Sequence, residues 1–405
     1  MSGEPVAVTG LGAVSGFGWG VEELWRGVLS GASAIRDFHR FDHTGYRTHV
    51  ASEVPDGPAL DPEAGGPRLT LADRFALVAA AEALAGARLP ERLEGAAAGL
   101  FFGSSTGGMF ESEQFFAQLV GRPRRAPISL LSAQQPCGPG DAVARAHGVT
   151  GPVETIASAC ASATLALGAA LDALRSGEIE LALAGGSDSL CRLTFGGFNA
   201  LRAVDERPCR PFRRERAGMS IGEGAAVLVL ESRARAERRG APVLAWLAGV
   251  GASCDAHHMT SPDPQGEGIS RAVAAALADA GLAPAAIDFV NLHGTGTPAN
   301  DSAEARMLAR IFGARAPALP ATSTKGCVGH FLGAAGAVEA LVTVLCLEHG
   351  LVHPTPGEGT LDPGLGVDLV VGAPRALPAA RRALSTNLAF GGANAACVLL
   401  HPEAA

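Results

Sequence analysis

One cysteine of the chain stands where a nucleophile is well placed. Cys160 lies in ETIASACASATLALG, where an apolar strand-like run ends and a helix-like run of small residues begins. The free N–H groups and positive dipole end of a helix favour a thiolate, and a sharp turn into the helix would present sulfur and a backbone N–H to one carbonyl group. Most free cysteines are instead buried and inert, so other motifs have to decide.

Two histidines in the second half of the chain follow apolar strand-like runs and stand beside glycines. His293 begins the segment HGTGTPANDSAE, and His330 lies in STKGCVGHFLGAAGAVEA. One such histidine is more often a hydrogen-bonded structural residue. Two neutral imidazoles that present N–H groups to one carbonyl oxygen could stabilise an enolate while a nearby cysteine carries an acyl group.

Charged residues accompany these histidines in an otherwise apolar, glycine-rich sequence. Lys325 lies five residues before His330, and Asp301 and Glu304 lie eight and eleven residues after His293. We expect them to form a buried charge network that holds the imidazoles in their tautomers. The alternative, that they are surface charges, fits the apolar surroundings less well.

Strand-like runs that alternate with Ala- and Leu-rich segments would position these groups, a pattern typical of layered α/β folds. The same order recurs from Val243 on, so we interpret the chain as two duplicated halves, 1–240 with the cysteine and 241–405 with the histidines. The expected strands are 6–9, 99–103, 153–157, 181–184, 225–230, 289–292, 319–324, 384–388 and 395–400. The expected helices are 74–85, 162–176, 232–239 and one that ends near Glu348.

Composition limits the class of protein. With 405 residues, 47% hydrophobic and 18% charged, the chain can bury a large core, which excludes a mainly disordered protein. Its net charge of −8 would repel nucleic acid and anionic membranes, so an acidic partner must dock on a local basic patch. The eight cysteines include no CxxC pair, which favours reduced thiols over disulfides or a zinc site. The apolar stretch 156–171 is too short for a bilayer and no signal-like start is present, so we expect a cytoplasmic location.

The ordered motifs resemble one family nearly end to end. The chain is similar to β-ketoacyl-acyl carrier protein synthases of the type II elongating class, the FabF-like condensing enzymes of the thiolase superfamily. The resemblance rests on VAVTGLGAVSGFG, SACASA, AGGSDS, IGEGAAVLVLE, HGTGTPANDSAE, STKGCVGHFLGAAGAVE and NLAFGGANA. The family's pattern of cysteine, histidine, lysine and histidine is complete here as Cys160, His293, Lys325 and His330. The resemblance implies a thiolase-like fold, two duplicated halves in αβαβα layers.

The resemblance also implies a reaction. Cys160 would take an acyl group as a thioester from the phosphopantetheine of an acyl carrier protein. His293 and His330 would assist loss of CO2 from a malonyl thioester and hold the enolate that attacks the acyl group. No metal ion or organic redox cofactor is required. The implied partners are an acyl carrier protein and either a second copy of the chain or a chain-length-factor-like subunit, in fatty-acid or type II polyketide synthesis of an aryl polyene-like kind.

Further residues receive roles from the same resemblance. The N–H groups of Cys160 and Phe390 would form an oxyanion hole, Phe390 would guard the acyl pocket, and Thr106 would limit its depth. The other implied residues are Asp301, Glu304 and Glu339 as supporting carboxylates, Thr295 and Thr297 against the pantetheine arm, and Arg202, Arg124 and Arg125 against the carrier protein.

The sequence departs from the family pattern at one position of the gate loop, and two alternative functions remain open. Ala389 in AFGG replaces a glycine expected to help the gate loop move, and its Cβ restricts the backbone. The chain could be a non-condensing scaffold or chain-length partner, but the cysteine is typically replaced in such subunits. It could also be a thiolase-like acyltransferase, but two histidines attend the cysteine instead of one histidine and a second cysteine.

Overall fold

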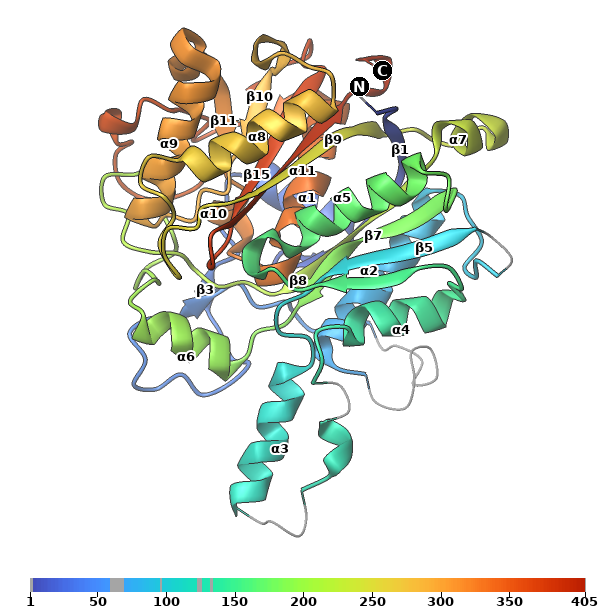
Figure 1. Ribbon diagram of the computed structural model, residues 1–405. Helices are drawn as coiled ribbons and strands as arrows, with labels where there is room; N and C mark the ends of the chain where they lie inside the picture. Colours follow the sequence, from blue (N-terminus) through green and yellow to red (C-terminus); the bar gives the residue numbers. More distant parts are fainter. Residues whose placement is uncertain (1–2, 59–68, 95–96, 122–125, 132–133, 405) are drawn as a thin grey trace.

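The molecule is built in layers of helices that alternate with two halves of a continuous β-sheet (Figure 1). The computed structural model describes residues 3–58, 69–94, 97–121, 126–131 and 134–404. Two helices lie between the halves of the sheet, and further helices cover each outer face. The αβαβα arrangement expected from the sequence is confirmed.

The first half of the sheet positions the cysteine. Its strands follow the order β1 (Val6–Ser15), β8 (Gly224–Glu231), β7 (Leu181–Asp188), β5 (Ala98–Gly103) and β6 (Val153–Ile156), and β2 (Gly18–Trp19) pairs with β1. β8 runs antiparallel to both neighbours, whereas β5 runs parallel to β7 and β6. The carboxyl ends of these parallel strands therefore meet at one edge of the sheet, which is where Cys160 follows β6.

The second half of the sheet positions the histidines. It continues through β9 (Ala245–Cys254), β16 (Ala393–Leu400), β15 (Arg382–Leu388), β10 (Phe289–Asn291), β11 (Pro320–Thr322) and β13 (Asp368–Leu369). β10 runs parallel to both β15 and β11, so the segments that follow these strands also meet at one edge. Three residue pairs between β1 and β9 join the two halves of the sheet. Two small ribbons pair β3 (Arg36–Asp37) with β4 (Val50–Ala51) and β12 (Leu351–Val352) with β14 (Arg375–Ala376).

Two helices of small residues form the central layer. α5 (Ser162–Arg175) and α11 (Ala335–His349) contact each other and strands of both halves. All residues of α11 from Ala335 to Leu347 are buried. Their close approach requires glycine, because a Cβ on Gly336 would lie 2.1 Å from Thr164 Oγ1 on α5. The segment Leu332–His349 is apolar and long enough to cross a membrane, with mean hydropathy 1.4, but 89% of it is buried inside the protein, as in a core helix.

The outer helices complete the layers. α2 (Leu71–Gly86) and α4 (Gly138–His147) pack on the first half of the sheet, and α8 (Glu267–Asp279) packs on the second, where α9 (Pro298–Phe312) covers α8. The remaining helices are α1 (Val21–Leu29), α3 (Met109–Gly121), α6 (Arg192–Ala200), α7 (Arg233–Arg239) and α10 (Lys325–Val328). α3 extends away from the layers, at the bottom of Figure 1.

The strands and helices expected from the sequence are present, although their first and last residues differ from the predicted ones. β1 continues to Ser15 because its pairing with β8 continues to Val14. The sequence did not locate β9, whose residues AWLAGVGASC include few of the β-branched residues typical of strands. The division into halves at 240 and 241 stays a prediction, and it falls between α7 and β9.

Candidate active site

Cys160 sits in a tight turn that joins β6 to α5. The turn is a short 3-10 helix, Ala159–Ala161, and Ala159 has a φ of 45°, a left-handed conformation that disfavours residues with a Cβ. The Ser162 hydroxyl braces the turn by donating to Ala159 O at 2.6 Å and accepting from Ser158 N at 2.8 Å. The side chain of Cys160 is thereby held at the start of α5, where it is 6% exposed.

His293 follows β10 in a loop that two buried carboxylates hold by its backbone. Glu304 accepts the N–H groups of His293 and Gly294, each at 2.7 Å. Asp301 accepts Gly296 N at 3.2 Å and Phe212 N at 2.7 Å. Burial raises the pKa of Asp301 to about 6 and that of Glu304 to about 7. Of the expected charge network, Lys325 contacts an imidazole nitrogen, with Nζ 2.8 Å from His293 Nδ1. The part that assigned the tautomer to Asp301 and Glu304 is wrong, because their oxygens accept from the loop backbone and from the side chains of Asn300 and Thr386.

The backbone of His330 is fixed against the segment 220–222 from the first half of the chain. Its N–H donates to Ser220 O at 2.8 Å, and its carbonyl accepts from Gly222 N at 2.9 Å. The buried Asp188, at the end of β7, accepts Gly333 N at 2.7 Å and Thr106 N at 2.8 Å. Asp188 therefore ties the loop after His330 to the loop after β5. The sequence reasoning missed Asp188, although it lies in the quoted motif AGGSDS.

The hydrogen bonds set the tautomer of each imidazole. His293 Nδ1 lies 2.8 Å from Lys325 Nζ and 3.3 Å from Asn387 Nδ2, which are both donors. His330 Nδ1 accepts the Leu332 N–H at 3.0 Å. The proton of each neutral ring therefore stands on Nε2. His330 Nε2 has no hydrogen-bond partner among the described residues, so its N–H is available to a ligand.

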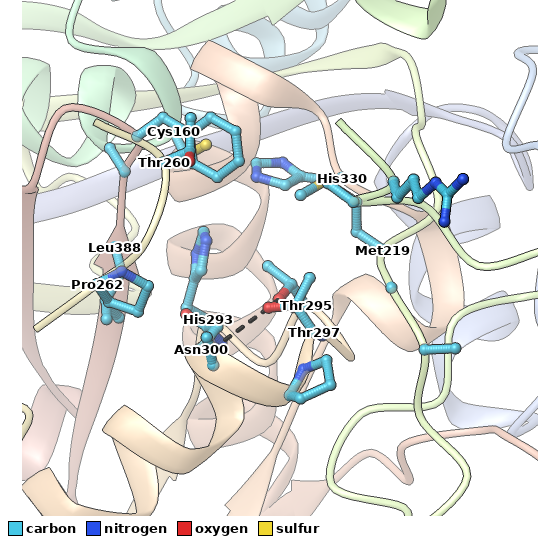
Figure 2. Close-up of a pocket in the computed structure, with 18 residues that line it drawn as sticks. Cys160, Met219, Thr260, Pro262, His293, Thr295, Thr297, Asn300, His330 and Leu388 are labelled. Atoms are coloured by element: carbon cyan, nitrogen blue, oxygen red, sulfur yellow. Dashed lines mark hydrogen bonds between the residues drawn. The ribbon is translucent and has the colours of Figure 1, made fainter. Parts of the chain in front are cut away.

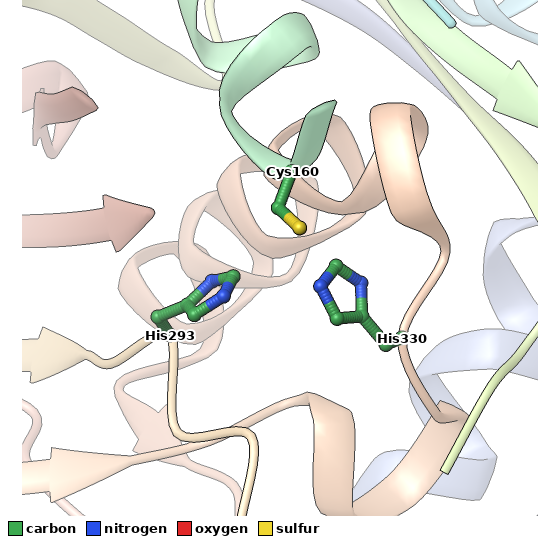
Figure 3. Close-up of side chains that lie close together, drawn as sticks. All are labelled: Cys160, His293 and His330. Carbon is green, nitrogen blue, oxygen red and sulfur yellow. The ribbon is translucent and has the colours of Figure 1, made fainter. Parts of the chain in front are cut away.

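The structure brings these side chains from both halves of the chain to one point. Figure 3 shows both imidazole rings facing the sulfur of Cys160. The ring centroids of His293 and His330 lie 5.2 Å apart and their planes cross at 86°. Lys325 stands behind His293 and forms a buried ion pair with Glu339 on α11. The arrangement presents two N–H donors beside one sulfur.

The three side chains could also hold a metal ion by residue type. Cys160 Sγ and a nitrogen from each histidine all lie within 4.8 Å of one another, and thiolate with imidazole is a donor set that suits zinc. Lys325, with Nζ 2.8 Å from His293 Nδ1, places a positive charge directly behind the site. That charge opposes a cation and favours an anionic oxygen.

Burial decides the resting protonation of the site. It raises the pKa of the Cys160 thiol to about 11, although Lys325 and the Phe390 N–H act in the opposite direction. The expectation of a resting thiolate is therefore wrong, because the helix start contributes only about 0.3–1 kcal/mol against full desolvation of the charge. Burial, together with the charge of Lys325, lowers the pKa of His293 and His330 well below the ordinary value. Both imidazoles are neutral at neutral pH.

The pocket that reaches Cys160 has a volume of about 270 Å³ (Figure 2). Thr295 and Thr297 line it, with their hydroxyl oxygens 2.9 Å apart, and the exposed Arg202 lies at its wall. Phe390 also lines it, and its N–H donates to Cys160 Sγ. The loop that carries Phe390 is tied down at Gly391, whose N–H donates to Met259 O at 2.7 Å, and its role as a gate stays a prediction.

Among the described residues implied by the resemblance, Thr106 does not line this pocket. Thr106 is buried elsewhere, and its hydroxyl donates to Asp188 Oδ1 at 2.8 Å. Arg124 and Arg125 lie outside the described residues. The roles given to all three residues stay predictions. The sequence reasoning missed Asn387, although it lies in the quoted motif NLAFGGANA.

Comparisons with known proteins identify the relatives of this chain. The family model described as β-ketoacyl synthase, N-terminal domain, matches residues 3–236, and the one described as β-ketoacyl synthase, C-terminal domain, matches residues 244–357. The 3-oxoacyl-(acyl-carrier-protein) synthase 2 of Staphylococcus aureus (strain COL) is 35% identical over 409 residues, which cover 98% of this chain and 99% of that protein.

Solved structures resemble the whole chain as well. The ishigamide ketosynthase/chain length factor superposes with a TM-score of 0.91 at 34% identity, covering 99% of this chain and 100% of that one. A ketosynthase structure described as a type II PKS acyl-carrier protein in complex with its ketosynthase bound to the hexaketide gives a TM-score of 0.91 at 29% identity, with the same coverage.

Proposed function

The chain belongs to the β-ketoacyl synthase family, and from this premise we propose that it joins a malonyl unit to an acyl group held on Cys160, with loss of CO2. The observation that carries the proposal is the pair of neutral imidazoles whose Nε2–H groups stand beside the Cys160 sulfur. Two such donors suit an enolate oxygen, whose negative charge develops during decarboxylation.

The first half of the reaction is a thioester exchange. The sulfur of Cys160 attacks the acyl carbonyl of a carrier-protein thioester, and the pantetheine sulfur leaves and takes up the proton that Cys160 gives away. The N–H groups of Cys160 and Phe390 stabilise the oxyanion of the tetrahedral intermediate, because both donate toward the sulfur in the resting site. A thiol of pKa about 11 reacts in this step by losing its proton as the carbon–sulfur bond forms.

The second half forms the carbon–carbon bond. The malonyl carboxylate leaves as CO2, and its electron pair becomes an enolate whose oxygen the two Nε2–H groups hold. The enolate carbon attacks the acyl–Cys160 carbonyl, and the carbon–sulfur bond breaks. Cys160 takes up one proton from solvent and returns to the thiol, so the products are CO2 and a β-ketoacyl thioester on the carrier protein. Lys325 and Asn387 keep His293 Nδ1 an acceptor throughout.

Substrates and partners follow from the same proposal. The acyl and malonyl groups arrive on the phosphopantetheine of an acyl carrier protein, and Thr295 and Thr297 contact that arm in the pocket. The enzyme works in the cytoplasm and needs no metal or redox cofactor. It pairs with a second copy or with a chain-length-factor-like subunit, in fatty-acid or type II polyketide synthesis.

One experiment separates this function from its alternatives. The protein is incubated with malonyl-carrier protein and a panel of acyl-carrier proteins, and intact mass identifies the products. A β-ketoacyl-carrier protein longer by two carbons supports condensation. Acylated Cys160 without that product would indicate an acyltransferase, and a protein that neither acylates nor decarboxylates would indicate a scaffold.

Charge reversal at the pocket mouth should weaken carrier-protein binding. The chain has a net charge of −8, so an acidic carrier needs local positive charge, and Arg202 is exposed at the wall of the pocket. We expect Arg202→Glu to raise the KM for acyl-carrier protein roughly fivefold, the scale of about 1 kcal/mol for a surface charge pair. A small thioester mimic should react as before. Arg88→Glu, at an exposed position after α2, is the matched control, and equal losses on both substrates would contradict the docking role.

Bulk at Thr106 should shorten the accepted acyl chain if that residue limits the acyl pocket. Thr106→Ile adds bulk but also removes the hydroxyl that donates to Asp188, whereas Thr106→Val removes the hydroxyl alone. We expect the Thr106→Ile variant to be less active than Thr106→Val on long acyl chains and equally active on short ones. Each methylene of the acyl chain that the pocket no longer buries should cost about 0.8 kcal/mol of binding free energy. Competition assays over a series of chain lengths measure this. A uniform loss across the series would show that Thr106 only supports the fold.

A further inference from the structure

Asn387 lies at the centre of the hydrogen bonds behind the catalytic histidine. It is fully buried on β15 and does not line the pocket. Its Nδ2 lies 2.6 Å from Glu339 Oε2 and 3.3 Å from His293 Nδ1, and its Oδ1 accepts the Thr164 hydroxyl at 2.5 Å. One amide therefore joins the histidine, the carboxylate and the helix that begins beside Cys160.

The orientation of this amide is fixed by its neighbours. Reversal would place Oδ1 against a carboxylate oxygen of Glu339 and against the lone pair of His293 Nδ1, so that three acceptor atoms would face one another. The amide packs closely on α11, because a Cβ on Gly336 would lie only 2.9 Å from Asn387 Oδ1.

Lys325 and Asn387 share one task. Lys325 contacts the Oε1 atom of Glu339 and His293 Nδ1, and Asn387 contacts Oε2 of the same carboxylate and the same Nδ1. The two donors thus bridge the carboxylate and the imidazole from two sides. We propose, on the basis of the function proposed above, that Asn387 is a positioning residue that keeps His293 Nδ1 an acceptor and its proton on Nε2.

Two isosteric substitutions test this role. Asn387→Leu removes all three hydrogen bonds, and Asn387→Asp replaces the donor facing His293 Nδ1 with an acceptor. We expect each to lower kcat for malonyl decarboxylation by about 10- to 100-fold, the scale of losing a group that orients a metal-bound imidazole through its other nitrogen. The KM for malonyl-carrier protein should stay within about twofold, because Asn387 does not line the pocket. Acylation of Cys160 should fall much less.

The aspartate variant should also change the pH profile. A carboxylate facing Nδ1 stabilises the imidazolium and raises the pKa of His293. When the pH is lowered, this variant should therefore lose activity at a higher pH than wild type does. The neighbouring groups that act on this pKa are Lys325, which lowers it, His330, which also lowers it, and Glu339, which faces Lys325 and Asn387. We expect the acid limb of kcat to move upward by about one pH unit in Asn387→Asp and to stay in place in Asn387→Leu.

Nitrogen NMR of the full chain with ¹⁵N-labelled histidine reads the tautomer without turnover. Wild type should show the His293 proton on Nε2, and Asn387→Asp should show it on Nδ1 or on both nitrogens. Ser385→Ala is the matched control, because Ser385 is equally buried on β15 and its hydroxyl has no hydrogen-bond partner within the part of the chain that the structure describes. If Asn387→Asp does not fold, Thr164→Val keeps the volume, removes the bond that orients the amide, and should lower kcat in the same direction.

The outcomes separate this proposal from the proposed function. A wild type and a Ser385→Ala variant that fail to decarboxylate or condense would overturn the function, whatever Asn387 does. If Asn387→Asp shows the same kcat, the same acid limb of its pH profile and the same nitrogen shifts as wild type, the positioning role is overturned. Equal losses of decarboxylation, Cys160 acylation and thermal stability would overturn it too, since they would mark a purely structural residue.

Discussion

Cys160→Ala is expected to abolish condensation while malonyl decarboxylation persists. The variant lacks the only atom that can carry the acyl group in the proposed reaction, so condensation should fall by on the order of 10⁴-fold or more. Decarboxylation should continue because the N–H donors of His293 and His330 do not depend on the sulfur. Intact mass of the carrier proteins measures both reactions, as β-ketoacyl product and as acetyl-carrier protein.

Peptide mapping supplies the control for this prediction. After incubation with an acyl thioester, the adduct should lie on Cys160 alone, although Cys254 is exposed and Cys137 is partly exposed. Cys254→Ala should condense as wild type does. An equal adduct on Cys254 or Cys137, or a Cys160→Ala variant that still condenses, would contradict the assignment of the nucleophile.

The second large effect is expected at the two histidines. His293→Ala and His330→Ala should each lower decarboxylation and condensation by roughly 10²-fold or more, the scale of losing one donor to a developing oxyanion. Cys160 acylation should survive better, because the oxyanion hole of that step is formed by the backbone. Single-turnover acylation and steady-state decarboxylation, measured on the same variants, separate the two steps.

Two further variants sharpen the test of the histidines. His330→Gln keeps an N–H donor and should retain more decarboxylation than His330→Ala. His39→Ala, at an exposed position, should leave both steps unchanged. A histidine variant that failed chiefly at acylation and kept normal decarboxylation would show that the residue acts as a base toward Cys160.

The sequence was sufficient to predict the layers of the fold and the residues that gather at the site. Cys160 follows β6 and His293 follows β10, each at the carboxyl end of a parallel strand in its own half of the sheet, so the local pattern carried long-range information. The expectation that His330 also stands directly after a strand is wrong, because α10 lies between β11 and His330. The family resemblance placed Lys325 in the same group. Glu339 was named only as a supporting residue, and its ion pair with Lys325 depends on how α11 packs.

The details that the sequence could not predict depend on three-dimensional burial. Asp301 and Glu304 looked like partners of an imidazole by spacing, yet their oxygens bind backbone N–H groups of the loop. Asn387 lies 94 residues from His293 along the chain, so nothing local marked it as a partner. The position of Cys160 at the N-terminal end of α5 suggested a thiolate, but only the fold shows that Cys160 is desolvated.

The protonated state of Cys160 has a consequence for covalent inhibitors. Because burial raises the pKa of Cys160 to about 11, the thiol predominates at neutral pH, so simple alkylating reagents should modify this sulfur slowly. A reagent whose own carbonyl oxygen reaches the Cys160 and Phe390 N–H groups gains stabilisation as the bond forms. Selective inactivators of this protein should therefore be chosen for the fit of a carbonyl beside the sulfur, and intrinsic electrophilicity is the poorer guide.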